Sequence, residues 1–151
     1  MSLRISRADA SRLEDTVRLF EGYLDFYRCE PAPEKARAFI FDRLSRQDAV
    51  IFLAEFDGAC VGFTQLYPAF ASLSMAPNWI LNDLFVEPAG RGKGVATALM
   101  EAARQLAVDT GAAEIFLQTA RDNSTAQGLY EGLGYKRDDQ FLVYTLSLPE
   151  P

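Results

Sequence analysis

A glycine-rich turn after a hydrophobic strand is the stretch of this sequence best suited to bind an anion. Residues 84–86 end an apolar run, and Gly90, Gly92 and Gly94 follow within a few positions. The free N–H groups at the start of a helix carry partial positive charge, and glycines let a ligand approach them closely. A helix that begins after Gly94 therefore predicts a binding site for a phosphate or diphosphate.

Two common phosphate-binding sequences do not match this turn. A P-loop requires Ser or Thr after its Gly-Lys pair, whereas here Gly94 follows Lys93. A dinucleotide-binding fingerprint requires a small residue at its third glycine position, where this chain has Val95 or Thr97. The turn therefore belongs to neither class.

The chain contains no histidine, which limits the chemistry open to it. No Ser-His-Asp triad, Cys-His pair or histidine-based zinc site can form. Its two cysteines, Cys29 and Cys60, are too few for a disulfide framework or a cysteine-only zinc site. Proton transfer near neutral pH must then use a carboxylate, a phenol, an amine, a thiol or water. We expect no metal, and we expect a reducing, cytoplasmic setting.

Charge and length exclude several classes of partner. Fifteen Lys and Arg residues against twenty-one Asp and Glu give a net charge of −6, which argues against nonspecific nucleic-acid binding and suits a cationic small molecule or peptide. No apolar run is long enough to cross a membrane, and residues 1–7 lack the apolar core of a secretory signal. We predict one domain over residues 1–151, with no nucleic-acid or membrane partner.

Hydrophobic spacing predicts the elements that position the turn. Strands are expected at residues 3–6, 49–56, 59–67, 79–86, 115–117 and 141–148, with one more near Tyr135, and helices at 11–27, 33–46, 95–110 and 123–133. Asp57-Gly58 predicts a hairpin turn, and residues 68–77 are expected to form a loop. Early hairpins and late crossovers indicate an α/β (α+β) fold, with a mixed, mostly antiparallel sheet of six to seven strands flanked by about four helices.

Two motifs together resemble the GNAT family of N-acetyltransferases. Arg91-x-x-Gly94-x-Ala96, after a strand that ends in Val-x-Pro, is similar to the acyl-CoA-binding motif of that family. Residues 123–135 are similar to its later helix, which lies beyond the next strand. The resemblance extends over about residues 49–146, and the family implies a GNAT-like fold.

The resemblance implies an N-acetyltransferase that moves the acetyl group of acetyl-CoA to a primary amine by direct attack. The acceptor is a small cationic amine, an amino acid or a peptide or protein amine, and the sequence does not choose among them. A non-catalytic acyl-CoA sensor on the same fold is the alternative, and a nucleotide-binding or structural α/β protein is the third interpretation.

The resemblance also implies which residues would contact the cofactor. The backbone near Leu84, Phe85 and Val86 would pair with the pantetheine arm and the acetyl carbonyl. The diphosphate would be held by the backbone amides of Arg91, Gly92, Lys93, Gly94, Val95 and Ala96. The cofactor side of the later helix would carry Asn123, Ala126 and Tyr130. Arg91 would either shape the loop or meet a phosphate, and Asn123 would cap its helix, bind pantetheine, or both. Gly128 departs from a good helix sequence, at a cost of about 1 kcal/mol relative to Ala.

Two ionisable residues are candidates for proton transfer. Tyr130 is the candidate general acid, because a phenol with an ordinary pKa of about 10 can protonate the departing thiolate. Asp83 is the candidate base, since it is a charged residue in an otherwise apolar strand, where burial raises the pKa. Asn82 could instead orient a water, and the sequence does not say which of the two faces the cleft.

Acidic and aromatic residues suggest where a cationic acceptor could bind. Glu21 and Asp25 interleave with aromatic residues, among them Tyr23 and Tyr27. This combination suits a cationic amine, but a solvated helix face is the favoured explanation. Phe70, in the expected loop, is a second candidate wall. The apolar pattern of residues 141–148 resembles strands through which GNAT proteins pair, which suggests a homodimer.

Overall fold

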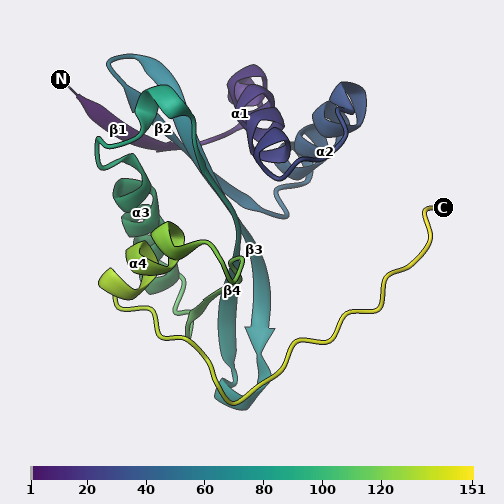
Figure 1. The fold of residues 1–151 in the computed structure, drawn as a ribbon, viewed down its shortest axis with the longest axis vertical. Coiled ribbons are helices and arrows are strands. Elements are labelled where there is room, and N and C mark those ends of the chain that lie inside the picture. Colours follow the sequence, from purple (N-terminus) through teal and green to yellow (C-terminus); the bar gives the residue numbers. More distant parts are fainter. Residues whose placement is uncertain (1) are drawn as a thin grey trace. The chain divides into compact units, whose positions relative to one another are not determined.

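Five strands form one sheet in the order β1-β2-β3-β4-β5 (Figure 1). A computed structural model describes residues 2–151 of the protein. The chain divides into a first unit that ends at Gln118 and a second unit that spans Thr119–Pro151. The elements of the first unit are β1 Leu3–Arg7, α1 Leu13–Phe26, α2 Pro33–Arg46, β2 Val50–Phe56, β3 Ala59–Ala71, β4 Ala76–Val86, α3 Val95–Asp109 and β5 Ile115–Leu117, with short 3-10 turns at Ala10–Arg12, Ser72–Ser74 and Pro88–Gly90.

The sheet is antiparallel from β1 to β4, and β5 joins β4 in parallel. The hairpin predicted at Asp57-Gly58 is confirmed: both residues have positive φ, 51° and 87°, as a tight turn between twisted strands requires. The α/β class and the mostly antiparallel sheet are therefore as expected.

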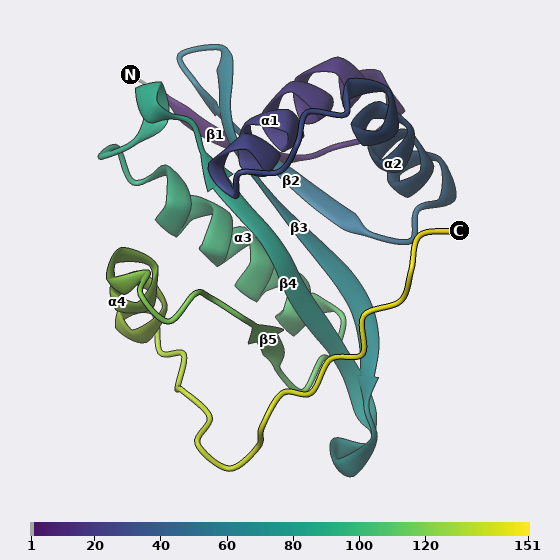
Figure 2. The ribbon, with the colours of Figure 1, turned by 45° about the vertical axis from the view of Figure 1, so that its right-hand side comes forward.

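The two faces of the sheet bear different helices (Figure 2). Side chains alternate between faces along a strand, so on β2 Ile51 and Leu53 pack with α1 and α2, while Phe52 and Ala54 pack near Val95 at the start of α3. Burying one apolar stripe of each helix against the sheet supplies the main stabilisation of such a layered fold.

Helix α1 lies very close to β4 at one glycine. An ideal Cβ built on Gly22 would lie 2.8 Å from Cε2 of Phe85, well inside van der Waals contact. The absence of a side chain at Gly22 therefore lets α1 rest on β4, and it brings the following residue, Tyr23, over the sheet beside the strand.

The expected loop at residues 68–77 is wrong. Strand β3 continues to Ala71 and β4 begins at Ala76, so the two strands form one long hairpin. Pairing between β2 and β3 stops at Val50 and Leu66, and Pro68 therefore lies where β3 has no partner on that side. A proline is tolerated in a strand at such an edge position, because no ladder hydrogen bond is lost.

The second unit contains helix α4, Ser124–Gly132, followed by a chain without regular structure. The strands expected near Tyr135 and at residues 141–148 are not present, so the described residues form five strands and not six to seven. A strand needs a ladder partner to satisfy its backbone groups, and residues 141–148 have none within residues 119–151. None of the helices between residues 2 and 151 is long and apolar enough to cross a membrane.

Candidate active site

Strand β4 leaves β5 just before the predicted site. The two strands pair only from Trp79 to Leu81, so residues 82–86 have β3 on one side and no strand of the first unit on the other. The register between β3 and β4 also shifts here: Gln65 pairs with Asp83, whereas Leu66 pairs with Leu81. Asn82 is thus the extra residue of a β-bulge, a feature that often re-aims side chains beside active sites.

The bulge decides the question left open between Asn82 and Asp83. Asp83 is 2% exposed and shares its face of β4 with Phe85, the face that α1 covers, whereas Asn82 is exposed. The Asn82 Nδ2 donates a hydrogen bond of 2.8 Å to Oδ1 of Asp83. The structure therefore buries the carboxyl of Asp83 and places the amide of Asn82 at its solvent side.

Asp83 is a buried carboxyl surrounded by neutral hydrogen-bonding groups. Burial raises its pKa above the ordinary value, although hydrogen bonds from Asn82, Gln65 and Tyr23 act in the opposite direction. The Gln65 Nε2 donates to Oδ2 of Asp83, and the Tyr23 hydroxyl also lies 3.4 Å from the backbone oxygen of Asn82. A carboxylate whose pKa is raised in this way binds a proton more strongly than an exposed one, which suits a proton acceptor.

Two tyrosines face Asp83 from different elements. Burial, together with the charge of Asp83, raises the pKa of both Tyr23 and Tyr67 well above the usual value for a phenol. Both side chains therefore remain neutral, and the Tyr23 hydroxyl hydrogen-bonds to Asp83 without adding a second charge.

The glycine turn has the geometry that anion binding requires. Gly92 and Gly94 have φ of 75° and 78°, a left-handed conformation that L side chains adopt only with strain, and Gly94 is the residue at which α3 is capped. Within residues 2–151 no hydrogen bond uses the N–H groups of residues 92–97. A Cβ on Gly92 or Gly94 would meet no atom within 4 Å, so the space beside these two Cα atoms is open.

Arg91 and Lys93 are engaged within the turn. The Arg91 Nε donates to the backbone oxygen of Val86 at 2.9 Å, and its backbone N–H donates to Pro88. The Lys93 Nζ donates to the backbone oxygen of Ala89 at 2.8 Å and lies 4.8 Å from the centre of the Phe56 ring. Both side chains shape the loop, which is the first of the two roles expected for Arg91.

The second unit presents the later motif on α4. The Asn123 side chain accepts a hydrogen bond of 3.1 Å from the N–H of Ala126, so it caps the helix as expected. Tyr130 is partly buried at the end of this helix, with its ring centre 6.0 Å from that of Tyr135. Asn123, Ala126 and Tyr130 are spaced for one face of α4, as the spacing predicts.

The predicted acceptor residues lie at three different places. Tyr27 packs edge-on against Tyr23, with ring centres 4.9 Å apart, and it therefore adjoins the Asp83 cluster. Phe70 is five positions beyond Gln65 on the long hairpin, roughly 17 Å along the strand, and it is 85% exposed.

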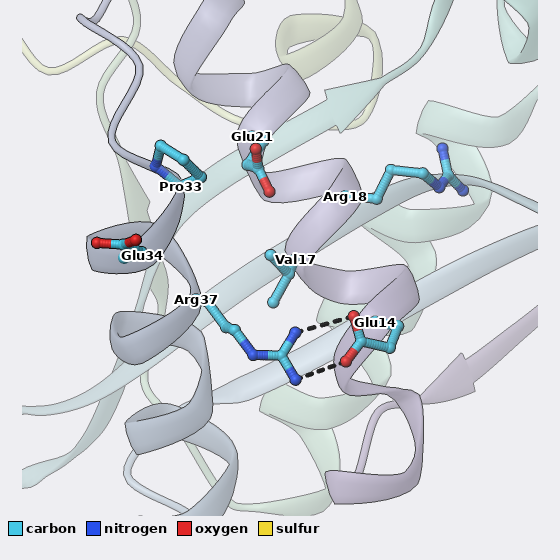
Figure 3. Close-up of a pocket in the computed structure, with 7 residues that line it drawn as sticks. All are labelled: Glu14, Val17, Arg18, Glu21, Pro33, Glu34 and Arg37. Carbon is cyan, nitrogen blue, oxygen red and sulfur yellow. Dashed lines mark hydrogen bonds and ion pairs between the residues drawn. The ribbon is translucent and has the colours of Figure 1, made fainter.

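Glu21 lines a different hollow, a groove of about 440 Å³ between α1 and α2 (Figure 3). In this groove Glu14 and Arg37 form an ion pair, and Glu21 lies farther along α1. Glu21 and Asp25 are each two residues from Tyr23, about 200° around the helix, so both occupy the face of α1 turned away from Asp83.

Three residues beside Asp83 were not among the predicted catalytic residues, although Tyr23 was named as an aromatic residue of the possible acceptor region. Gln65 and Tyr67 lie on β3 and Tyr23 on α1, and all face Asp83. Gln65 carried a usable signal, since it is a polar side chain in a continuous apolar strand, as Asp83 is. Among residues 2–151 no group of three or more His, Cys, Asp or Glu side chains is placed to hold a metal ion.

Comparisons with known proteins agree with the geometry. The sequence profile of the acetyltransferase (GNAT) family matches residues 16–135. The uncharacterized N-acetyltransferase YhfO of Bacillus subtilis (strain 168) is 42% identical over 147 residues, 97% of this chain and 99% of that protein. A crystal structure of a probable acetyltransferase is 39% identical, covers 98% of this chain and 99% of that chain, and has a TM-score of 0.92.

A more distant structure shows the same fold with a ligand. It is that of AAC(6′)-Iy in complex with the bisubstrate analogue CoA-S-monomethyl-acetylneamine, with 21% identity, a TM-score of 0.81 and coverage of 98% of this chain and 100% of that chain. The chain therefore belongs to the acetyltransferase (GNAT) family, and it is an acetyl-CoA-dependent N-acetyltransferase.

Proposed function

We propose that this enzyme transfers the acetyl group of acetyl-CoA directly to a primary amine, with Asp83 as the base. One observation carries the proposal: a buried carboxyl with a raised pKa lies on the part of β4 that has left β5, and this strand runs straight into the open amides of the glycine turn. A proton acceptor and an anion site are thus joined by a few residues of one strand.

The residues fit the coenzyme along this strand and turn. The unused N–H groups of residues 92–96 would bind the diphosphate, and the backbone of Leu84, Phe85 and Val86 would pair with the pantetheine arm. On α4, the Oδ1 of Asn123 accepts the hydrogen bond that caps the helix, and the resemblance of residues 123–135 to the family motif supports Asn123 as a ligand of the pantetheine arm. When bound, acetyl-CoA supplies the carbonyl carbon that the amine attacks and the thiolate that leaves.

Asp83 would accept the proton that the amine must lose. A primary amine resembles Lys, whose ordinary pKa is about 10.4, so it is protonated at neutral pH and cannot attack until it is deprotonated. A buried carboxylate has a stronger affinity for that proton than an exposed one. Asn82, at the solvent side, would orient either the amine or a bridging water, and the phenol of Tyr130 would protonate the thiolate.

The acceptor is a cationic amine, and the site favours one with an ammonium group on a flexible chain or ring. The ring faces of Tyr23 and Tyr27 beside the carboxyl of Asp83 provide cation–π and charge attraction together. Small amines, amino acids and peptide amines share this chemistry.

Acetyl-CoA-dependent release of free thiol, measured with a panel of amines, tests the proposal. Turnover with at least one cationic amine is expected, and Asp83→Asn should reduce kcat by about 10²–10⁴-fold, the usual contribution of a general base, without weakening CoA binding. Tyr130→Phe should behave similarly. Tight CoA binding with no turnover on any amine would instead identify a non-catalytic acyl-CoA sensor.

We also propose that the enzyme is a cytoplasmic homodimer. Phe141, Leu142, Val143, Tyr144, Leu146 and Leu148 are all at least 69% exposed in an extended segment, and such a segment readily pairs with a second chain. Both thiols are free, which suits a reducing compartment. Light scattering coupled to size exclusion should give twice the mass of the chain, and a monomer would contradict the assembly.

A further inference from the structure

Gln65 is an amide buried in the apolar core directly opposite Asp83. Its side chain is 0% exposed, and its neighbours in sequence include the fully buried Phe63 and Leu66. It pairs with Asp83 across the β3–β4 ladder at the last position before the bulge. The amide and the carboxyl therefore form one buried pair, held from both strands.

One end of this amide is bonded and the other is not. The Nε2 donates to Oδ2 of Asp83, but Oε1 is buried and has no hydrogen-bond partner among residues 2–151. An unpaired buried acceptor costs about 1–3 kcal/mol, so a native protein rarely keeps one without a reason. The spare oxygen of Gln65 is one rotation away from the carboxyl that the reaction protonates.

A side-chain amide presents a donor and an acceptor of nearly the same shape. Rotation by half a turn about its last bond exchanges Nε2 and Oε1. A carboxylate can only accept a hydrogen bond, whereas a protonated carboxyl also donates one. Oε1, which lies away from Asp83, has no partner among residues 2–151, so the hydrogen bond to Asp83 is the one that selects which end of the amide faces the carboxyl.

We propose that Gln65 is a positioning residue for acetyl transfer: its Nε2 donates to the Asp83 carboxylate, and the amide turns over so that Oε1 accepts the O–H of Asp83 once the proton of the amine has arrived. The carboxyl then keeps the same place before and after proton transfer. The proton passes from the substrate nitrogen to Asp83 and later to solvent, and no covalent bond to Gln65 forms. This inference rests on the proposed role of Asp83 as the base.

The other hydrogen-bonding groups around Asp83 are neutral, so none of them adds a charge to the pair. Tyr23 approaches from α1, Tyr67 from β3 and Asn82 from the same strand. Both phenols remain protonated, because burial and the charge of Asp83 raise their pKa values well above the ordinary one. Arg43 of α2 and its ion-pair partner Asp48 act on Tyr67 with opposite signs.

Nuclear magnetic resonance of the wild-type protein tests the pair without any turnover. The side-chain carboxyl signal of Asp83 and the side-chain amide signals of Gln65 are followed as a function of pH. We expect the Gln65 signals to change with the same midpoint as the Asp83 carboxyl, and we expect them to be independent of pH in Asp83→Asn. Gln65 signals that remain constant while Asp83 titrates would overturn the proposal.

Two variants of similar shape connect the pair to the reaction. Gln65→Met removes both donor and acceptor, so the acidic limb of the kcat/KM profile should move to higher pH, with about tenfold lower kcat/KM on that limb for each unit of movement. Gln65→Glu should move it farther, since two adjacent carboxyls share one proton. An equal loss of kcat/KM at every pH would mean a merely structural role and would contradict the proposal.

The two proposals fail in distinguishable ways. If Asp83→Asn retains wild-type turnover, Asp83 is not the base, and the magnetic resonance titration still reports whether Gln65 follows its protonation. If Asp83→Asn is inactive but the acidic limb of the kcat/KM profile has the same midpoint in Gln65→Met as in the wild type, Asp83 is the base and the role proposed for Gln65 is wrong. Thermal melts of each variant check that it is folded.

Discussion

A Cβ atom on Gly22 of α1 would lie 2.8 Å from Cε2 of Phe85 on β4. This close approach sets the height of α1 above the sheet. Because Tyr23 is the next residue, the same contact fixes the hydroxyl of Tyr23 at the Asp83 cluster. Packing between a helix and a strand thus positions a side chain of the candidate site.

Replacing Gly22 with Ala should therefore destabilise the protein. We expect the free energy of unfolding to fall by about 1–3 kcal/mol, the usual cost of overpacking, as measured by urea denaturation. Gly128→Ala is the matched control, because Gly128 is also helical and a Cβ there would meet nothing within 4 Å. That variant should be unchanged or more stable by about 0.5–1 kcal/mol; similar losses in both would contradict the packing account.

The pH dependence of stability should reveal the buried carboxyl of Asp83. The pKa of Asp83 is raised in the folded state. As the pH rises above the ordinary pKa of an aspartate, the unfolded chain therefore loses the carboxyl proton before the folded protein does. Over that window the folded state binds more protons, so Asp83 lowers the free energy of unfolding with increasing pH. The stability of Asp83→Asn relative to wild type should therefore increase as the pH rises above the ordinary pKa of an aspartate, about 3.9.

Asp48→Asn gives the control of opposite sign for this measurement. The pKa of Asp48 is lowered by its hydrogen bond with Arg43, so its contribution to stability is present above the ordinary pKa and is lost as the pH falls. Relative to wild type, Asp48→Asn should therefore become less stable as the pH rises. Chemical denaturation at several pH values measures both, and a flat difference for Asp83→Asn would show that its carboxyl titrates normally.

Substitution of Gly94 should weaken binding of CoA. Its φ of 78° strains any residue with a side chain, and Ala has no compensating interaction. We expect Gly94→Ala to raise the Kd for CoA about tenfold, or about 1.4 kcal/mol, in titration calorimetry. Gly94→Asn should be affected less, because Asn tolerates the left-handed region better than Ala; equal affinity in wild type and Gly94→Ala would argue against the turn as the diphosphate site.

A partly buried ion pair should stabilise the junction between the first helical turn and the sheet. Arg12 lies 2.7 Å from Glu55 on β2 and also donates to the sulfur of Cys60. Removing the carboxylate leaves a partly buried guanidinium without its main partner, so Glu55→Gln should cost about 1–3 kcal/mol of unfolding free energy. Glu14→Gln, which breaks an exposed pair with Arg37, should cost about 0–1 kcal/mol; an equal cost for the two would contradict the importance of burial.

Local sequence signals predicted the helices, most of the strands and the glycine turn. The spacing of apolar residues located α1, α2 and α3, and the glycines after β4 marked the turn, because both features depend on residues close together in the chain. The prediction was wrong at Pro68. A proline indicates a loop, except where the neighbouring strand, here β2, has ended and no hydrogen bond to it is lost. That ending depends on the pairing of Val50 with Leu66, which is a tertiary property.

The arrangement around Asp83 could be predicted only in part. Asp83 could be selected because it is a charged residue in an apolar strand. Which side chain faces α1, however, is determined by the bulge at Asn82, since a one-residue shift of register moves each side chain to the opposite face of the sheet. Tyr23 reaches the site because Gly22 allows α1 to approach β4. These relationships join residues about 60 positions apart, and no local pattern encodes them.

A crystal structure of the complex with CoA tests the central claim most directly. The diphosphate should lie within hydrogen-bond distance of the amides of residues 92–96, and the thiol end should lie along residues 84–86 with the carboxyl of Asp83 on the acceptor side. A diphosphate bound at any other surface, or a thiol end directed away from Asp83, would contradict the account.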